Sequence, residues 1–241
     1  MPGLERSYWI VGASEGLGRA LAEALDAQGI SLILSARNAA RLEDLAGRLK
    51  DARALPMDVT DPASIAEAVA LAGEVDGLIY CVGLYDPMTA RDWKPEAAEA
   101  IVEANFTGAL RILGRVVPGM VARGRGHVVL IGSLAGFRGL PGAIGYGASK
   151  AALMHLGENM RADLKGSGVR VQLANPGFID TRLTRKNDFR MPSLMTPEQA
   201  AGHVMRAMRG RRFSTSFPAP FAWLFSIGGR YLPLRWFQGL F

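Results

Sequence analysis

The stretch Tyr8-Trp-Ile-Val-Gly-Ala-Ser-Glu-Gly-Leu-Gly18 decides the fold, because a short apolar run leads directly into a glycine-rich turn. Its glycines are Gly12, Gly16 and Gly18, and a segment of helical period follows. Gly12 permits a tight turn, Gly16 lets the backbone approach a phosphate, and Gly18 allows close helix packing. A strand, this turn and a helix N-terminus together predict a pyrophosphate site. A plain strand-to-helix turn is the alternative interpretation.

Apolar runs rich in Val, Ile and Leu recur along the chain and alternate with segments of helical period. The strand-like runs are 8–11, 32–34, 78–82, 128–131 and 169–173, with weaker candidates at 52–56 and 213–217. The helix-like segments are 17–28, 39–50, 64–72, 97–121 and 146–165. Asp61-Pro62 and Thr196-Pro-Glu-Gln199 have the residues of helix N-caps. This alternation predicts an α/β fold with a doubly wound parallel sheet and helices on both faces.

The end of the second predicted strand, Ser35-Ala-Arg37, indicates which nucleotide the site prefers. Enzymes that choose NAD usually place a carboxylate here for the ribose 2′-hydroxyl, whereas this chain has Ala36 followed by Arg37. A guanidinium attracts a 2′-phosphate, so NADP(H) is favoured and NAD(H) stays open. The acidic Glu15 in the glycine loop argues in the other direction. A solvated charge at a helix start is the alternative interpretation of Arg37.

Tyr146 and Lys150, in the run Gly145-Tyr-Gly-Ala-Ser-Lys150, share one face if residues 146–165 are helical. A nearby ammonium lowers the pKa of a phenol, which is ordinarily about 10. A tyrosine tuned in this way can pass a proton to or from a carbonyl oxygen near neutral pH. Taken alone, the pair is also typical of a solvated contact or of a core tyrosine. Ser133, thirteen positions upstream, favours the catalytic interpretation.

Several further motifs follow the glycine loop in order and support a family resemblance. They are Asp58 in Met57-Asp-Val59, Asn105 in Asn105-Phe-Thr-Gly108, Ser133, the Tyr146/Lys150 pair and Pro176-Gly177. With them the chain closely resembles the short-chain dehydrogenase/reductase family over about residues 7–181. The resemblance implies a seven-stranded Rossmann fold, NAD(P)-dependent carbonyl/alcohol interconversion, and a homo-oligomer, either a dimer or a tetramer, formed through the helices at 97–121 and 146–165.

The resemblance also implies the roles of single residues. Tyr146 would be the acid/base, Lys150 would lower its pKa and hold the nicotinamide ribose, and Ser133 would hydrogen-bond the substrate oxygen. Asn105 would support a proton relay through water, Asp58 would meet the adenine, and Thr181 the carboxamide and phosphates. The implied cofactor-binding residues are Gly12, Ser14, Gly16, Leu17, Gly18, Arg37, Asp58, Val59, Gly83, Tyr146, Lys150, Pro176, Gly177, Ile179 and Thr181.

Two departures from the family pattern bear on cofactor contact. Where relatives often have Asn-Asn-Ala-Gly after the fourth strand, this chain has Tyr80-Cys-Val-Gly83 and keeps only the last glycine. The usual Thr before the glycine loop is Val11, which removes a hydroxyl that ties the loop to a neighbouring strand. Neither change affects Asn105, Ser133, Tyr146 or Lys150.

Composition narrows the class of protein. One cysteine, Cys81, excludes an internal disulfide, and no basic, apolar leader precedes residue 8, so we expect a cytoplasmic protein. His127, His155 and His203 lack ligand spacing, so no metal site is expected. Residues 1–181 hold 18 Lys and Arg against 20 Asp and Glu, whereas residues 182–241 hold 10 against 2. A local basic excess favours an anionic cofactor, a membrane surface or an acidic substrate over nucleic acid.

The C-terminal residues 217–241 contain 8 of the 19 aromatic residues and no acidic residue. Gly228-Gly229-Arg230 and Pro233 interrupt the segment, so it is not expected to span a membrane. One interpretation is an interfacial anchor that would make the protein peripheral at the inner face of a membrane. The residues expected in the headgroup boundary are Trp223, Phe225, Trp236 and Phe237, and those expected on anionic lipid are Arg209, Arg211, Arg212, Arg230 and Arg235. The other is a cover over the substrate pocket or a subunit interface.

We therefore expect a nucleotide-binding domain over residues 1–216, with a substrate lid at 182–195, and 217–241 as an apolar extension of that domain. The predicted lid combines basic residues with apolar residues such as Leu183, Phe189 and Met191, and this combination suits a lipophilic substrate with an anionic group. A lid that packs on the protein surface without contacting substrate would have a similar composition. The predicted function is NADP-dependent reduction of a small-molecule ketone or aldehyde. The alternative is a catalytically silent NADP(H)-binding regulatory or scaffold protein.

Overall fold

A seven-stranded, all-parallel sheet forms the centre of the protein in the computed structural model, which describes residues 3–240. Its strand order is β3-β2-β1-β4-β5-β6-β7. The strands are β1 Ser7–Val11, β2 Ser31–Ser35, β3 Ala52–Ala54, β4 Gly77–Tyr80, β5 Gly126–Ile131, β6 Val169–Pro176 and β7 Ser214–Phe217. The order reverses between β1 and β4, which opens a crevice at the carboxyl ends of these strands.

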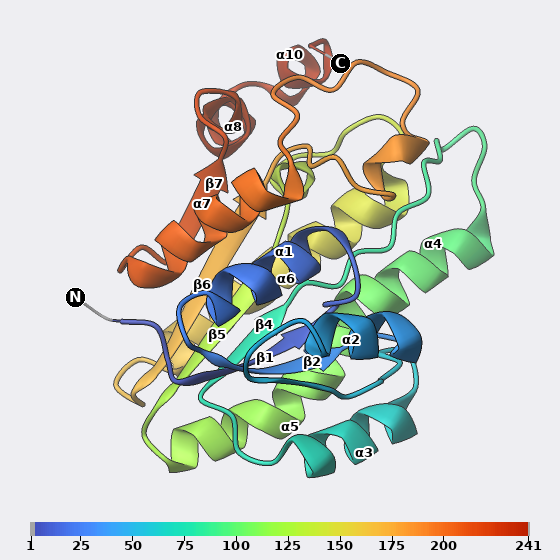
Figure 1. The fold of residues 1–241 in the computed structure, drawn as a ribbon. Coiled ribbons are helices and arrows are strands. Elements are labelled where there is room, and N and C mark those ends of the chain that lie inside the picture. Colours follow the sequence, from blue (N-terminus) through green and yellow to red (C-terminus); the bar gives the residue numbers. More distant parts are fainter. Residues whose placement is uncertain (1–2, 241) are drawn as a thin grey trace.

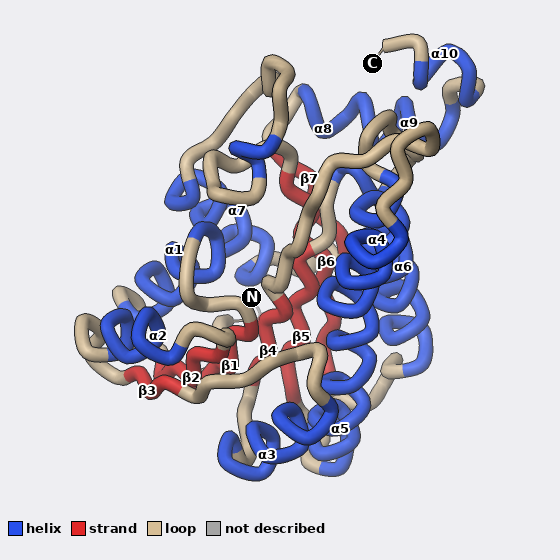
Figure 2. Tube along the Cα trace, turned by 90° about the vertical axis from the view of Figure 1, so that its right-hand side faces the viewer, coloured by secondary structure: helices blue, strands red, loops and turns tan. Residues whose placement is uncertain are grey.

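Helices cover both faces of the sheet (Figures 1 and 2). On one face lie α1 Gly16–Asp26, α2 Ala39–Ala46 and α7 Pro197–Arg209, and on the other lie α3 Pro62–Ala72, α4 Pro95–Val102, α5 Gly108–Ala122 and α6 Ile144–Asp163. Single turns and short helices complete the chain: η1 Glu103–Thr107, η2 Leu134–Gly136, η3 Thr184–Lys186, α8 Phe221–Trp223, η4 Leu224–Gly228, α9 Gly229–Tyr231 and α10 Leu234–Gln238.

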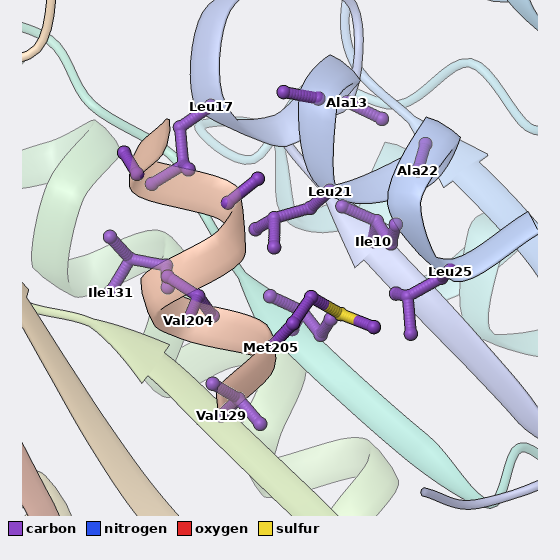
Figure 3. Packing of buried hydrophobic residues seen from close by; sticks show 14 of the residues in the cluster. Ile10, Ala13, Leu17, Leu21, Ala22, Leu25, Val129, Ile131, Val204 and Met205 are labelled. Carbon is purple, nitrogen blue, oxygen red and sulfur yellow. The ribbon is translucent and has the colours of Figure 1, made fainter. Parts of the chain in front are cut away.

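The core follows from the apolar pattern of the strands and helices. All six residues of β5 are buried, as a strand covered on both faces requires. Helix α1 buries Leu17, Leu21 and Leu25, spaced four apart, and packs them toward Val204 and Met205 of α7 (Figure 3). Burying each such side chain stabilises the fold by about 1.5–3 kcal/mol. These contacts hold the helix that follows the glycine loop firmly against the sheet.

The predicted doubly wound sheet is confirmed, including the two weaker strand candidates. Those two candidates correspond to β3 and β7, the edge strands of the sheet. Their sequences are less apolar because some of their residues stay exposed. Asp61 caps α3 by accepting a hydrogen bond from the Ala63 amide, and Thr196 forms the predicted capping box at α7. The single helix predicted at 97–121 is wrong in detail, because the π-helical turn η1 separates α4 from α5.

The C-terminal residues 221–240, which include α8 and α10, follow the carboxyl end of β7 and lie above the sheet (Figure 1). Arg209, Arg211 and Arg212 precede β7, at the opposite end of that strand. The expectation that these three arginines meet lipid together with the aromatic segment is therefore not met. Phe225 and Phe237, which were expected in the headgroup boundary, are buried against the domain. Within the described residues, no helix has the length and apolar character needed to cross a membrane.

Candidate active site

A cavity of about 540 Å³ opens at the carboxyl ends of the central strands, at the crevice between β1 and β4. Fourteen of the fifteen residues predicted to bind the cofactor line it: Gly12, Ser14, Gly16, Leu17, Gly18, Arg37, Val59, Gly83, Tyr146, Lys150, Pro176, Gly177, Ile179 and Thr181. The exception is Asp58. Its carboxylate accepts hydrogen bonds from the amide and the hydroxyl of Thr60, at 2.9 and 2.8 Å, while its neighbours Met57 and Val59 line the cavity.

The glycine loop has the conformation that its sequence predicts. Gly12 and Gly16 have φ values of 95° and 55°, a region that side chains disfavour. A Cβ on Gly18 would lie 2.0 Å from the carbonyl oxygen of Gly12, so only glycine allows α1 to pack this close. Glu15, the N-cap of α1, makes no side-chain cap. The amides of the first turn are therefore available to an anion, which fits a dinucleotide pyrophosphate.

Charged side chains surround the nucleotide end of the cavity. The carboxylate of Glu15 accepts hydrogen bonds from Arg41 at 2.9 Å and from Arg182 at 3.1 and 2.5 Å. The positive charges of two guanidinium groups thus offset the negative charge of Glu15, the residue that disfavoured NADP(H) in the sequence. Arg37 lines the same cavity and forms no ion pair with another described residue.

Sequence reasoning missed Arg41 and Arg182 as site residues. Arg41 lies four positions after Arg37, in the first turn of α2, so helical spacing could have found it. Arg182 reaches the site only because the chain after β6 folds back over the glycine loop. No local sequence pattern predicts that contact.

Tyr146, Ser133 and Lys150 come together at the other end of the cavity. Tyr146 lies in the first turn of α6, and Ser133, which follows β5, lies close enough to its hydroxyl to lower the pKa of the phenol. The Lys150 ammonium donates to the carbonyl oxygens of Val82 and Ile131, at 3.1 and 2.9 Å, and lies 5.9 Å from the centroid of the Tyr146 ring. The spacing of four residues does place both side chains on one face of a helix.

The pKa of Tyr146 differs in direction from the expectation. Burial raises this pKa to about 12, and the nearby Ser133 hydroxyl offsets part of the rise. Burial also lowers the pKa of Lys150 to about 8. The ammonium is held by two backbone carbonyls and does not contact the phenolic oxygen, so its charge does not lower the tyrosine pKa as predicted.

Asn105 lies in the π-helical turn η1 and is fully buried. Its side chain accepts from the Leu84 amide at 2.7 Å and donates to the Leu84 carbonyl at 2.9 Å and to Ser149 Oγ at 3.0 Å. Ser149 in turn donates to the Tyr146 carbonyl. Asn105 therefore ties the loop after β4 to the first turn of α6, and its part in a proton relay stays a prediction.

The residues that depart from the family pattern also meet at the cavity. Cys81 and Val82 line it, and burial raises the pKa of the Cys81 thiol to about 12, so this thiol stays neutral. A Cβ on Gly12 would lie 2.9 Å from the backbone of Cys81. No group of three His, Cys, Asp or Glu side chains that could hold a metal occurs within residues 3–240.

Comparison with known proteins agrees with this architecture. The family model for short chain dehydrogenases matches residues 7–191. An uncharacterized oxidoreductase of Myxococcus xanthus is 37% identical over 221 residues, which cover 88% of this chain and 87% of that protein. The 3-oxoacyl-[acyl-carrier-protein] reductase of Escherichia coli is 32% identical over 209 residues, covering 84% of this chain and 82% of the enzyme.

Solved structures match over nearly the whole chain. A short chain dehydrogenase from Burkholderia cenocepacia in complex with NADP has a TM-score of 0.85 and 28% identity, covering 95% of this chain and 94% of its own. A short-chain dehydrogenase from Sphingobium yanoikuyae in complex with NADPH has a TM-score of 0.84 and 28% identity, covering 92% and 91%. The glycine loop, the central crevice, the Ser133–Tyr146–Lys150 arrangement and these matches agree, and the chain belongs to the short-chain dehydrogenase/reductase family of oxidoreductases.

Proposed function

We propose that this protein reduces a ketone or aldehyde to an alcohol with NADPH, and that Tyr146 donates the proton. The observation behind this proposal is that the hydroxyls of Tyr146 and Ser133 lie close together at the inner end of a cavity that a glycine loop closes at the other end. A nucleotide laid across the loop would end beside this pair. A carbonyl oxygen that accepts from both hydroxyls would then be polarised for hydride attack.

Each residue contributes one step. The bound nicotinamide would supply the hydride that forms the new C–H bond. Tyr146 gives its phenolic proton to the carbonyl oxygen and takes another from solvent, so the alcohol leaves neutral. A pKa of about 12 keeps the phenol protonated at neutral pH, which suits proton donation in the direction of reduction. Ser133 holds the same oxygen, and Asn105 would support the relay that restores the tyrosine proton.

Lys150 has the capacity to hold the cofactor ribose. An ammonium has three N–H donors, and two of them reach the carbonyls of Val82 and Ile131. One donor is left for a ribose hydroxyl.

NADP(H) is the proposed cofactor, with NAD(H) left open. Arg37 offers a guanidinium that has no ion-pair partner in the described part of the chain, at the place where a 2′-phosphate would lie, and the Arg41 and Arg182 contacts balance Glu15. The solved relatives in complex with NADP and NADPH support the same choice.

A lipophilic substrate is proposed because aromatic side chains lie beside Tyr146 and beside Gly177, which lines the cavity. The Tyr85 ring packs edge-on against Tyr146 with centroids 5.2 Å apart, and Phe178 stacks with Phe221 at 6.0 Å. The relative from Escherichia coli is named for a 3-oxoacyl substrate, so 3-oxoacyl thioesters belong in the assay. We also infer a dimer or tetramer, since α5 exposes Leu110 and Val121.

The test is oxidation of NADPH and of NADH against a panel of long-chain ketones, aldehydes and 3-oxoacyl thioesters, with the alcohol identified by mass spectrometry. The proposal predicts one alcohol formed per NADPH oxidised and a higher kcat/KM with NADPH than with NADH. NADPH binding without turnover on any carbonyl or alcohol would refute it and favour the silent, nucleotide-binding alternative.

A further inference from the structure

The C-terminal segment, residues 221–240, has an outer face that the fold leaves uncovered. We define this outer face by six side chains that are between 48% and 75% exposed: Trp223, Ile227, Tyr231, Leu234, Trp236 and Leu240. Trp223, Ile227 and Tyr231 follow one another at intervals of four, as do Trp236 and Leu240, which is the spacing of one side of a helix. A contiguous apolar face of this kind on a protein surface usually marks an interaction site.

The opposite side of the same segment is packed firmly onto the domain. Ala222, Phe225 and Phe237 are buried in a small cluster with Leu134, and Arg138 donates a hydrogen bond to the Leu232 carbonyl at 3.0 Å. The segment is thus apolar on both sides. Within the described residues, only its inner side packs against other parts of the protein. A helix that is apolar all round is stable only when both sides are covered.

The charge of the segment favours an anionic partner. The segment contains Arg230 and Arg235 and no Asp or Glu, and Arg235 is exposed next to Leu234 and Trp236 of the outer face. A second copy docked by two-fold symmetry would bring this surface against itself and would leave its arginines without carboxylates. Helix α5, which exposes Leu110 and Val121, lies near the other end of the molecule from α8 and α10 (Figure 1), and a subunit contact through this helix would leave the outer face free.

We propose that the outer face is a membrane-docking surface that lies flat on an anionic bilayer. Tryptophan, tyrosine and arginine are the side chains that favour the boundary between headgroups and acyl chains, and the flanking Ile and Leu residues would enter the acyl region. The arginines would pair with lipid phosphates.

This docking surface adjoins the substrate side of the cavity, which extends the proposed function and depends on it. Consecutive ring contacts join the lid to the end of the chain: Phe189 to Phe178 at 5.8 Å, Phe178 to Phe221 at 6.0 Å, Phe221 to Phe225 at 5.2 Å and Phe225 to Phe237 at 5.6 Å. A Cβ on Gly177, which lines the cavity, would lie 3.5 Å from Phe221. The substrate class we infer is therefore a bilayer-soluble carbonyl lipid.

The experiment measures co-sedimentation of the full chain with vesicles of phosphatidylcholine alone and of phosphatidylcholine with phosphatidylglycerol. The double variant Trp223→Ser/Trp236→Ser is compared with Trp93→Ser, because Trp93 is 55% exposed but lies before α4, outside the segment. We expect binding to the anionic vesicles, weakened about tenfold or more in the double variant and unchanged in Trp93→Ser. Quenching of the tryptophan fluorescence of Trp93→Ser by brominated lipid is a second measurement, since Trp9 is fully buried and Trp223 and Trp236 are the exposed tryptophans that this variant retains.

Three results would overturn the docking surface: no binding of the parent to anionic vesicles, equal binding by parent and double variant, or a smaller oligomer in the double variant, which would mark an interface between copies. Turnover on the carbonyl panel that tests the proposed function, measured on the same samples, separates the two proposals. Vesicle binding without turnover would refute the reductase alone, and turnover without vesicle binding would refute the docking surface alone.

Discussion

Arg37 and Arg41 lie four residues apart but differ in what their guanidinium groups contact. Arg41 pairs with Glu15 at 2.9 Å, whereas Arg37 has no ion-pair partner among residues 3–240. A free guanidinium can bind a phosphate without first breaking a salt bridge. Arg37 is therefore the residue that we expect to distinguish NADPH from NADH.

Replacing Arg37 with Ala should raise the KM for NADPH about tenfold or more and leave the KM for NADH nearly unchanged, because only the first cofactor has a 2′-phosphate. Steady-state kinetics with both cofactors measures this. Arg48→Ala is the matched control, since Arg48 lies on the same stretch of chain, pairs with Asp44 and is not part of the cavity lining. Equal changes in the KM values for NADPH and NADH would show that Arg37 does not bind the 2′-phosphate.

For single residues, the sequence predicted the position of a site residue correctly where that position depends on the spacing to its neighbours in the chain. The glycine loop, Arg37, Tyr146 and Lys150 all lie at the cavity as predicted. The partners of these residues were not predictable, because Glu15 meets Arg182 across 167 positions and Lys150 meets Val82 across 68. Burial of Tyr146, which the local spacing does not reveal, raises its pKa, whereas the spacing of the pair predicted a lower pKa.

The glycine loop and α1 act as one element, since the loop fits only if the helix approaches it closely. Gly18→Ala places a methyl group 2.0 Å from the Gly12 carbonyl oxygen, so the backbone must shift. We expect the free energy of unfolding to fall by about 2 kcal/mol or more, and NADPH binding to weaken as well.

Gly114→Ala in α5 is the matched control for this prediction. Nothing lies within 4 Å of a Cβ at Gly114, and alanine favours a helix interior, so the free energy of unfolding should rise by about 0.5–1 kcal/mol. Chemical denaturation measures both variants. A Gly18→Ala protein as stable as the parent would contradict the tight approach of α1 to the loop.

Helix boundaries were the least predictable part of the elements. The apolar period of residues 97–121 continues through η1, so it gives no sign of the extra residue in a π-helical turn. That turn contains Asn105, and its side chain bonds to Leu84 and Ser149. The resemblance to the family predicted the functional importance of this position, and only the structure gives these contacts.

In the molecule as a whole, one buried histidine joins the central strands. His127 Nδ1 accepts hydrogen bonds from the Tyr8 hydroxyl at 2.6 Å and from Arg170 at 2.9 Å, because an arginine can only donate. Its Nε2–H donates to Gln172 at 2.8 Å. The ring must therefore be neutral, and burial lowers the pKa of His127 from 6.5 to about 3.

This pKa predicts how stability depends on pH. The unfolded chain protonates His127 below about pH 6.5 while the folded protein cannot, so the stabilisation is complete above that pH and is lost as the pH falls toward about 3. From this group alone the free energy of unfolding should fall by about 1.4 kcal/mol per pH unit. Denaturation between about pH 6 and about pH 4.5 should show this slope in the parent and in His155→Gln, and a shallower slope in His127→Gln. Parallel slopes in all three proteins would contradict a neutral, buried His127.

The arrangement of strands was predictable because alternating strands and helices admit few topologies once every strand is buried on both faces. The place of the aromatic C-terminal segment was not, because its composition suits a lipid surface, a pocket cover and a subunit interface equally well. Only the structure separates its buried side at Phe225 and Phe237 from its exposed side at Trp223 and Trp236.

The most direct test of the account compares the parent with Tyr146→Phe on the best carbonyl substrate at saturating NADPH. Removing the one hydroxyl that can give the proton should lower kcat about a hundredfold or more, while the Kd for NADPH, measured by fluorescence, stays within about threefold of the parent value. Ser133→Ala should lower kcat in the same direction. A Tyr146→Phe protein that turns over as fast as the parent would contradict the proposed chemistry.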